Sequence, residues 1–344
     1  MNEPVGGSYR RDVELDRQAI EALAGSLGSM ATKDHPLGAL TTYRVGGTAA
    51  LAVTVDSRAD LVSVHHAIVH AQARIPVLVM GKGSNLLVAD TGFQGLLVIL
   101  GKELSAIDIE DTAVRGGGGA GLPVLARRSA SAGLHGLEWA VGVPGSVGGA
   151  IKMNAGGHGS DTASVLDRCS VFDLISGRDY EASASDLHLS YRSSSLRASD
   201  VVLWAEFRLA RGDRSTAEAK VAEVVRWRRE HQPGGSNAGS VFTNPPGDSA
   251  GRLIDSAGLK GVRVGTACVS PKHANFIQAD EGGSADDVAR LMAYVQRCVA
   301  ERLGVELEPE VRMIGFEGAG GKKGEQSQNP NPQPQVQSHS SGSG

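Results

Sequence analysis

The sequence predicts an α+β protein whose N-terminal part is built from small α/β units and whose C-terminal part forms a separate α+β domain. Three observations support this fold class. Residues 51–100 alternate between strand and helix patterns, residues 101–212 mix short strands with glycines, and a polar turn at 211–214 precedes two long helical patterns. At 344 residues, the chain is long enough for about two domains.

The first unit has the pattern strand, helix, strand, loop and strand. Short apolar runs at 51–55, 76–80 and 96–100 have the length of buried strands. Ser57 precedes the helical pattern and Asp60 follows it by three residues, which is the spacing of a capping box. The apolar residues of this helix recur at helical spacing and mark its buried face: Leu61, Val64, Ile68 and Ala71.

Residues 101–212 predict a second unit of short strands with one clear helix. The helix is expected around residues 122–132, where Pro123 is tolerated because the first helical turn has no partner for its N–H groups. Runs at 170–174 and 201–209 predict strands of an α+β sheet.

We place the start of a separate C-terminal domain near residue 213, directly after the polar turn. Ser215 and Glu218 have capping-box spacing and predict the first helix of this domain. Ser284 and Asp287 predict a second, longer helix with one apolar face.

Composition argues against several classes of protein. The formal net charge of −4 argues against nucleic-acid binding, which depends on clustered Lys and Arg. Neither a secretory signal nor an apolar run of ~20 residues is visible, so we expect no membrane association. The final segment, 317–344, is rich in Gly, Ser, Gln, Asn and Pro and is expected to be a disordered tail.

The cysteines favour a reducing, cytoplasmic setting. Cys169, Cys268 and Cys298 are far apart in the sequence and form no CxxC motif. We therefore expect neither a disulfide framework nor a zinc site, and no other metal site is predicted.

Two glycine-rich segments suggest a site for a long, phosphate-bearing cofactor. The first, Gly-Lys-Gly-Ser-Asn at 81–85, directly follows a predicted strand. The second spans 142–150 and continues into 153–159. Glycine lets the backbone approach a ligand closely, and successive N–H groups in such a turn can bind an anion, with Lys82 adding positive charge. One such segment alone is more often an ordinary turn, but two could hold both ends of one cofactor.

Four other segments contain residues of candidate chemistry, and for each there is also a simpler structural interpretation. Ser240 is either a turn serine or a proton donor. Arg192 is either a surface arginine or a guanidinium fork for a carboxylate. Glu310 is either a paired charge on an edge strand, on one face with Arg312, or a general acid or orienting group in a cleft. Lys272 and His273 are either solvated loop residues or a phosphate or carboxylate contact.

Taken together, the chain resembles the UDP-N-acetylenolpyruvoylglucosamine reductase family, whose members are flavoenzymes of peptidoglycan synthesis. The matching segments follow the family's order across roughly residues 35–315. They are 41–47 (TTYRVGG), 81–86 (GKGSNL), 142–149 (GVPGSVGG), 190–192 (SYR), 239–242 (GSVF) and 308–312 (EPEVR).

The resemblance implies a flavin-binding fold of the vanillyl-alcohol-oxidase type with an added substrate domain. It divides the chain into an N-terminal extension (1–30), two FAD-binding subdomains (31–100 and 101–212) and a substrate-binding domain (213–316). It implies noncovalent FAD, NADPH as hydride donor and UDP-N-acetylglucosamine enolpyruvate as substrate, with no obligate protein partner. Between Trp204 and Arg229 the chain lacks room for the substrate-capping insertion of one subtype, so the shorter subtype is expected.

The resemblance also implies residue roles. Arg192 and Glu310 would stabilise an anionic intermediate, and Ser240 would protonate it. Substrate contacts would come from Tyr191, Asn244, Lys272 and His273. Cofactor contacts would come from Tyr43, Arg44, Gly81, Lys82, Gly83, Ser84, Asn85, Leu86, Gly142, Pro144, Gly145, Ser146, Gly148, Gly149, Asn154, Ala155 and Gly156.

The sequence departs from the family pattern at two positions. His231 stands where many relatives carry a lysine that would face a diphosphate, and His158 stands where a tyrosine is common. Arg228, Arg229 or Lys272 could replace the missing charge.

Two alternative functions remain open on the sequence. One is a different FAD-dependent oxidoreductase of the same fold that acts on a sugar or alcohol, for which His158 leaves covalent flavin attachment possible. The other is a flavin or nucleotide-sugar binding module without catalysis.

Overall fold

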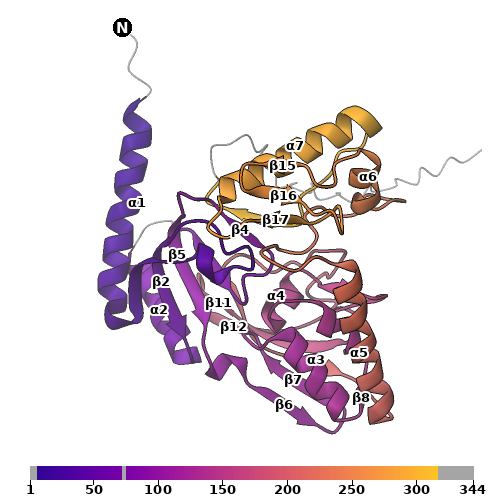
Figure 1. Ribbon diagram of the computed structural model, residues 1–344. Helices are drawn as coiled ribbons and strands as arrows, with labels where there is room; N and C mark the ends of the chain where they lie inside the picture. Colours follow the sequence, from indigo (N-terminus) through magenta and orange to yellow (C-terminus); the bar gives the residue numbers. More distant parts are fainter. Residues whose placement is uncertain (1–5, 72–74, 317–344) are drawn as a thin grey trace, which may run out of the picture.

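The computed structural model describes residues 6–71 and 75–316, and these form three units around a common centre (Figure 1). The tail predicted at 317–344 lies outside the described residues. The first unit is a four-stranded sheet in the order β1-β2-β5-β3, in which β2, β5 and β3 are parallel and β1 is antiparallel to β2. Its strands are β1 (Ala31–His35), β2 (Ala49–Val55), β3 (Val77–Met80) and β5 (Phe93–Leu100).

Two helices cover this first sheet. Helix α2 (Arg58–His70) begins at the predicted capping box, because Ser57 accepts from the N–H of Asp60 and Asp60 accepts from that of Ser57. Helix α1 (Gly6–Leu27) was not predicted, although it lies in the expected N-terminal extension. Its second half is part of the core, with Leu23 fully buried among α2 and sheet residues.

The second unit is a five-stranded antiparallel sheet in the order β12-β11-β13-β7-β6. The predicted strands and the helix with Pro123 in its first turn are present, as part of β11, β13 and α3. The sheet and its helices are β6 (Ile107–Glu110), β7 (Ala113–Gly117), β11 (Leu166–Asp173), β12 (Arg178–Ser183), β13 (Asp200–Arg208), α3 (Leu122–Ser131) and α4 (Val147–Lys152). Short hairpins and 3₁₀ turns complete this unit: β8 (Leu134–His135) with β14 (Ala210–Arg211), β9 (Gly156–Gly157) with β10 (Ser160–Asp161), η3 (Glu103–Ser105) and η4 (Glu138–Gly142).

Helix α5 (Arg214–His231) follows the predicted domain boundary but packs on the second unit. It contacts α3 and η4, and Val224 belongs to the second hydrophobic core (Figure 1). Downstream of α5, the third core begins at Ala238. The boundary near residue 213 therefore stays a prediction, and side-chain packing alone would place the change of unit just after α5.

The predicted cap of α5 is wrong. Asp213 is the N-cap, and its carboxylate accepts from the N–H of Thr216. Ser215 instead donates to Asp213, and Glu218 pairs with Arg214. The helix starts earlier than predicted because an aspartate in the polar turn is itself a strong N-cap residue.

The third unit packs helix α7 (Ala285–Leu303) and α6 (Ala250–Ser256) on a three-stranded sheet. That sheet consists of β15 (Arg263–Val264), β16 (Ala267–Val269) and β17 (Ile277–Ala279). Ser284 caps α7 as predicted, but the carboxylate of Asp287 accepts from Thr266 rather than completing the box. The helix ends at Gly304, which adopts the left-handed conformation at its C-terminus.

The chain finally returns to the first unit, and this return positions the site. Strand β18 (Arg312–Ile314) pairs in parallel with β4 (Leu86–Val88), the strand that follows the first glycine segment. The N–H of Arg312 donates to the carbonyl of Asn85, and the side-chain amide of Asn85 donates to the carbonyl of Glu310. Residues more than 200 positions apart are thereby fixed side by side.

Candidate active site

A cavity of about 660 Å³ lies where the three units meet, within the usual size range of ligand pockets. Both glycine-rich segments line it. Of the predicted cofactor residues, the lining includes Gly81, Lys82, Gly83, Ser84, Asn85, Leu86, Gly142, Pro144, Gly145, Ser146, Gly148, Gly149, Ala155 and Gly156. Their roles toward a cofactor remain predictions, but the fold gathers them around one space.

The two glycine segments face each other at close range. A Cβ atom built on Gly81 would lie 1.9 Å from Oγ of Ser146, a position that only glycine permits. Gly83 has φ +59°, and its Cβ would lie 2.7 Å from the carbonyl oxygen of Leu40. Ser146 also caps α4 by accepting from the N–H of Gly149 at 3.2 Å. Glycine thus lets the two backbones approach each other closely and form a narrow cradle, which fits a long ligand such as a dinucleotide.

Replacing Gly81 by alanine is expected to damage this cradle. The new methyl would push Ser146 away from Gly81, at an overpacking cost of about 1–3 kcal/mol, and would weaken FAD binding by roughly ten-fold or more. Calorimetric FAD titration and urea unfolding measure the two effects. Gly25→Ala in α1, where a Cβ meets no atom within 4 Å, is the matched control. Unchanged FAD affinity in Gly81→Ala would show that the cradle does not hold the cofactor.

Three predicted cofactor residues lie away from the cavity wall. Tyr43 is fully buried in the core of the third unit, where burial raises the pKa of its hydroxyl. Arg44 is exposed. Asn154 is buried behind the wall, and its amide donates to the carbonyl of Ser190 at 3.0 Å. Asn154 therefore fixes the segment that carries Arg192 rather than lining the cavity itself.

Arg192 and Glu310 meet at the cavity as an ion pair. Nε of Arg192 lies 2.6 Å from Oε1 of Glu310, without the alignment of a hydrogen bond. Nη2 of Arg192 donates to the carbonyl of Gly156 at 3.2 Å. Burial raises the pKa of the Glu310 carboxyl above its usual value, against the opposing charge of Arg192. The carboxyl is therefore easier to protonate than an exposed glutamate.

Arg192 adopts the left-handed backbone conformation, with φ +56°. This conformation is uncommon for a residue other than glycine and is held in place by its surroundings. The carbonyl of the preceding Ser190 accepts from buried Asn154, which anchors the turn. The strain is consistent with a side chain that must point in one direction.

Ser240 lines the same cavity and is held through its neighbours. The N–H of Glu310 donates to the carbonyl of Val241 at 2.8 Å, so the segments of Ser240 and Glu310 lie against each other. On the other side, the buried amide of Asn275 accepts from the N–H of Phe242 and donates to its carbonyl. Ser240, Arg192 and Glu310 thus reach one cavity from three separate segments of the chain.

The predicted substrate contacts divide into one residue at the cavity and three outside its lining. His273 lines the cavity, and burial together with Lys260 lowers its pKa. Tyr191 is 58% exposed, with the Arg192 guanidinium over its ring. Asn244 accepts from the N–H of Ala250, and Nζ of Lys272 donates to the carbonyl of Arg229 at 2.5 Å. These four roles stay predictions.

Three cationic residues at the cavity were not predicted as site residues: Lys152, Arg197 and Arg312. Burial and the charge of Arg312 lower the pKa of Lys152 to about 8, although Asp200 opposes the shift. Arg312 also lines the cavity, and burial lowers its pKa. The sequence places Arg312 on one strand face with Glu310, so the alternation could have identified it. Lys152 follows the second glycine segment on α4, and no local pattern indicates it.

Lys152 is expected to give the protein a pH-dependent stability. Its pKa is near 8 in the folded state and about 10.4 when unfolded, so the unfolded state binds more protons between these values. The penalty for its buried charge is present below pH 8 and disappears as pH rises toward 10. Urea unfolding of wild type and Lys152→Met at pH 7 and pH 9.5 should show wild type gaining stability relative to the variant. A constant difference would contradict the assigned pKa.

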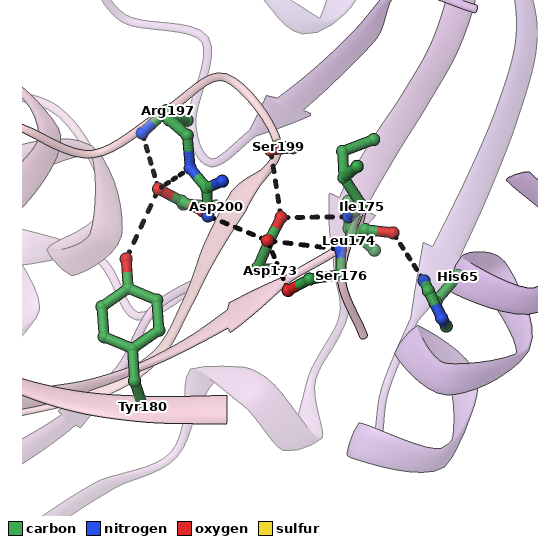
Figure 2. A network of polar contacts seen from close by, with 9 residues as sticks. All are labelled: His65, Asp173, Leu174, Ile175, Ser176, Tyr180, Arg197, Ser199 and Asp200. Atoms are coloured by element: carbon green, nitrogen blue, oxygen red, sulfur yellow. Dashed lines mark hydrogen bonds and ion pairs between the residues drawn. The ribbon is translucent and has the colours of Figure 1, made fainter. Parts of the chain in front are cut away.

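A polar network supports the wall behind the cavity (Figure 2). Arg197, which lines the cavity, bridges two buried carboxylates, with Nη2 at 2.9 Å from Asp173 and 3.0 Å from Asp200. Burial raises the pKa of Asp173, but hydrogen bonds from Ser176 and the Ile175 N–H and the charge of Arg197 outweigh burial and lower it. The network fixes the segment between Arg192 and β13.

The same region ties the first two units together. The ring Nδ1 of His65 in α2 donates to the carbonyl of Leu174, which follows β11 (Figure 2). Leu174 and Phe172 also belong to the core of the first unit. The cavity is therefore bounded by two sheets that pack directly on each other.

Other features of the described residues concern metals, membranes and thiols. Within residues 6–71 and 75–316, no three His, Cys, Asp or Glu side chains are grouped closely enough to hold a metal ion. In the part of the chain that the structure describes, no helix is both long and apolar enough to cross a bilayer. Cys169, Cys268 and Cys298 are free thiols, and none of them lines the cavity.

Comparison with protein families defines the class. Residues 49–178 match the FAD binding domain family, and residues 231–314 match the C-terminal domain of UDP-N-acetylenolpyruvoylglucosamine reductase. The first match contains both glycine segments that form the cradle. The fold and the site together define an FAD-binding protein with an added C-terminal domain, as predicted.

Individual relatives identify the family. A UDP-N-acetylenolpyruvoylglucosamine reductase from Rubrobacter xylanophilus is 44% identical over 284 residues, which are 82% of this chain and 94% of that protein. Such a reductase from Bacillus thuringiensis is 37% identical over 305 residues, covering 88% and 99%. The crystal structure of the reductase from Thermus caldophilus matches with a TM-score of 0.71 and 37% identity, covering 83% and 98%. The chain belongs to the UDP-N-acetylenolpyruvoylglucosamine reductase family.

Proposed function

We propose that this protein reduces UDP-N-acetylglucosamine enolpyruvate to UDP-N-acetylmuramate, a step in the synthesis of peptidoglycan precursors, with NADPH as reductant. One observation carries the proposal: Arg192, Ser240 and Glu310 come from distant segments and line the cavity that the two glycine segments bound. FAD bound between the two glycine segments would supply the transfer of hydride from NADPH to the substrate. Side chains of the protein are proposed to bind the substrate carboxylate, stabilise the negative charge and supply the proton.

Arg192 is proposed to bind the substrate carboxylate. Addition of a hydride to the methylene carbon of the enol ether places negative charge on the neighbouring carbon and, by delocalisation, on the carboxylate oxygens. A guanidinium fork aimed at these oxygens stabilises that charge, and preorganised charge of this kind is usually the largest catalytic term. The contact with Glu310 and the hydrogen bond to the carbonyl of Gly156 hold the fork in position.

Glu310 is proposed to carry a proton when the substrate binds. An ionised glutamate would repel the substrate carboxylate, whereas a protonated one can donate a hydrogen bond to it. The raised pKa of Glu310, caused by burial, favours this state.

Ser240 is proposed to complete the reaction by donating its hydroxyl proton to the carbanionic carbon. A serine is a weak acid in water, but the intermediate is a strong base. The hydride and this proton together saturate the double bond and leave the ether intact. The serine is then reprotonated from solvent.

The other expectations follow from the same proposal. No cysteine lines the cavity, so noncovalent FAD is proposed, and acid precipitation should release it from the protein. His158 is at the wall, so flavin that stays bound after acid treatment would favour a covalent oxidase.

We propose a cytoplasmic location and small molecules as the ligands. The chain runs from β13 through β14 directly into α5, which is consistent with the shorter subtype.

Product analysis tests the activity. The FAD-loaded protein should consume NADPH and the enolpyruvyl substrate in equal amounts and yield a product that has gained two hydrogen atoms by mass. Oxidation of a sugar or alcohol with oxygen, together with inertness toward the enolpyruvate, would instead support a different oxidoreductase. FAD binding without turnover of either substrate would support a binding module.

A further inference from the structure

Three aromatic rings form a cluster at the wall of the cavity on the side of α5. Trp227 stacks on His231 with ring centres 4.7 Å apart and planes at 13°. The ring of His158 meets Trp227 nearly at a right angle, with centres 4.9 Å apart. Trp227 and His158 line the cavity, yet 40% of Trp227 remains exposed. None of these rings has a part in the chemistry proposed above.

The surrounding structure holds the cluster in place. His158 occupies the turn between β9 and β10 with φ +53°, an uncommon conformation for a residue other than glycine. Its ring would lie 3.3 Å from a Cβ on Gly142, so the second glycine segment lets it approach. His231 is tied to the helix by a contact of 2.8 Å between its Nδ1 and the carbonyl of Trp227.

A second tryptophan shows what is unusual about Trp227. The ring of Trp204 is covered by the guanidinium groups of Arg115 at 4.2 Å and Arg168 at 5.5 Å. Among the described residues, no guanidinium lies over Trp227. A large ring that is exposed at a cavity, and not covered by the protein's own cations, can accept a planar ligand.

The positive charge of Arg228, next to Trp227, indicates which class of ligand would bind here. Arg228 lines the cavity, and burial lowers its pKa. Its Nε donates to Oε1 of Gln232 at 2.8 Å, and no carboxylate in the described part of the chain lies within ion-pair distance of it. A partly buried cation without a counter-ion, directly beside an aromatic surface, matches a planar base joined to phosphate groups.

We propose that Trp227, flanked by His158 and His231, forms the wall on which the base of a nucleoside diphosphate stacks. Arg228 lies beside this wall, and the family resemblance already offers it as a cation for the phosphates. The inference rests on the proposed function, since the UDP-linked substrate and NADPH both contain a nucleoside diphosphate. The two histidines that flank Trp227, His158 and His231, stand at the two positions where this chain departs from the family pattern.

Calorimetric titration of the FAD-loaded protein with UDP and, separately, with NADP⁺ tests the proposal. Trp227→Ala should raise the Kd of at least one ligand by roughly ten-fold or more, because the stacking of a base on an aromatic ring strengthens binding by about this factor. Trp227→Phe should recover most of the affinity, and Trp204→Phe should change neither Kd. A loss for UDP alone assigns the wall to the substrate, a loss for NADP⁺ alone to the reductant, and a loss for both to a shared wall. Unchanged affinity for both ligands overturns the proposal.

A fluorescence measurement keeps the proposal testable if Trp227→Ala fails to fold. The chain has three tryptophans, of which Trp139 is buried in the second core and Trp204 is covered by arginines. The ligand that stacks should change the tryptophan emission of wild type but not that of Trp227→Phe at ligand saturation. The same change of emission in both proteins would overturn the proposed stacking. This measurement does not depend on whether the enzyme forms product. Failure of the enolpyruvyl activity with ligand stacking retained would contradict the proposed function while leaving the subsite intact.

Discussion

Ser240→Ala should lower product formation by about 10²–10³-fold, or about 2.7–4 kcal/mol in barrier, while flavin reduction by NADPH proceeds at the wild-type rate. The reason is that the hydroxyl supplies a proton only after hydride has reached the substrate, so the earlier half-reaction does not need it. Anaerobic stopped-flow spectroscopy at the flavin absorption band separates the two halves.

Ser240→Cys is the control, because a thiol restores a proton donor at the same position. We expect it to recover part of the lost product formation. If alanine turns over as fast as serine, Ser240 is not the proton donor. If alanine slows flavin reduction as much as product formation, the substitution has disturbed the cavity as a whole.

Arg192→Lys should reduce kcat/KM for the enolpyruvyl substrate by roughly 10²-fold, the scale of losing one group that stabilises a developing negative charge. Lysine keeps the positive charge but is a point donor, and it cannot contact two carboxylate oxygens and Glu310 in one plane. The KM for NADPH should change little, because the carboxylate contact is absent in that half-reaction.

Arg208→Lys provides a matched control, since Arg208 pairs with Asp167 on an exposed part of the second unit. It should leave both KM values and kcat unchanged. Retained activity in Arg192→Lys would exclude a bidentate contact with the substrate. An equal loss for NADPH and substrate would move Arg192 from the carboxylate to a general structural role.

Local sequence patterns predicted the elements whose causes are local. The helix after Ser57 forms where its capping box and apolar spacing required, and the strand that precedes Gly81 occupies its predicted place. The cap of α5 was misplaced because the polar turn offers two possible N-cap residues. Asp213 is the one that accepts from the N–H of Thr216, and Ser215 is not. The N-terminal helix was missed because its buried face is completed by α2 and the first sheet, which are distant in sequence.

The site residues also fall into two groups: those that a local sequence pattern indicates and those that only the fold brings to the cavity. The cradle could be predicted because close backbone approach requires glycines, which are visible in the local sequence. Arg192, Ser240 and Glu310 could be predicted because they lie in motifs that follow the family's order. Lys152 and Trp227 were not predicted as site residues because only the packing of α4 and α5 beside the second glycine segment brings them to the cavity. Tyr43 and Asn154 lie within motif segments of the sequence, yet folding buries both of them away from the cavity lining.

The most direct test of the account is an anaerobic single turnover in D₂O. NADPH should bleach the flavin absorption, and one equivalent of UDP-N-acetylglucosamine enolpyruvate should restore it and yield a product with deuterium on the carbon beside the carboxylate. Deuterium at this carbon would show that a solvent-exchangeable proton reaches it, and the recovered flavin absorption would show that the substrate has taken the hydride. A flavin that stays bleached with the enolpyruvate and recovers only with oxygen would contradict the central claim.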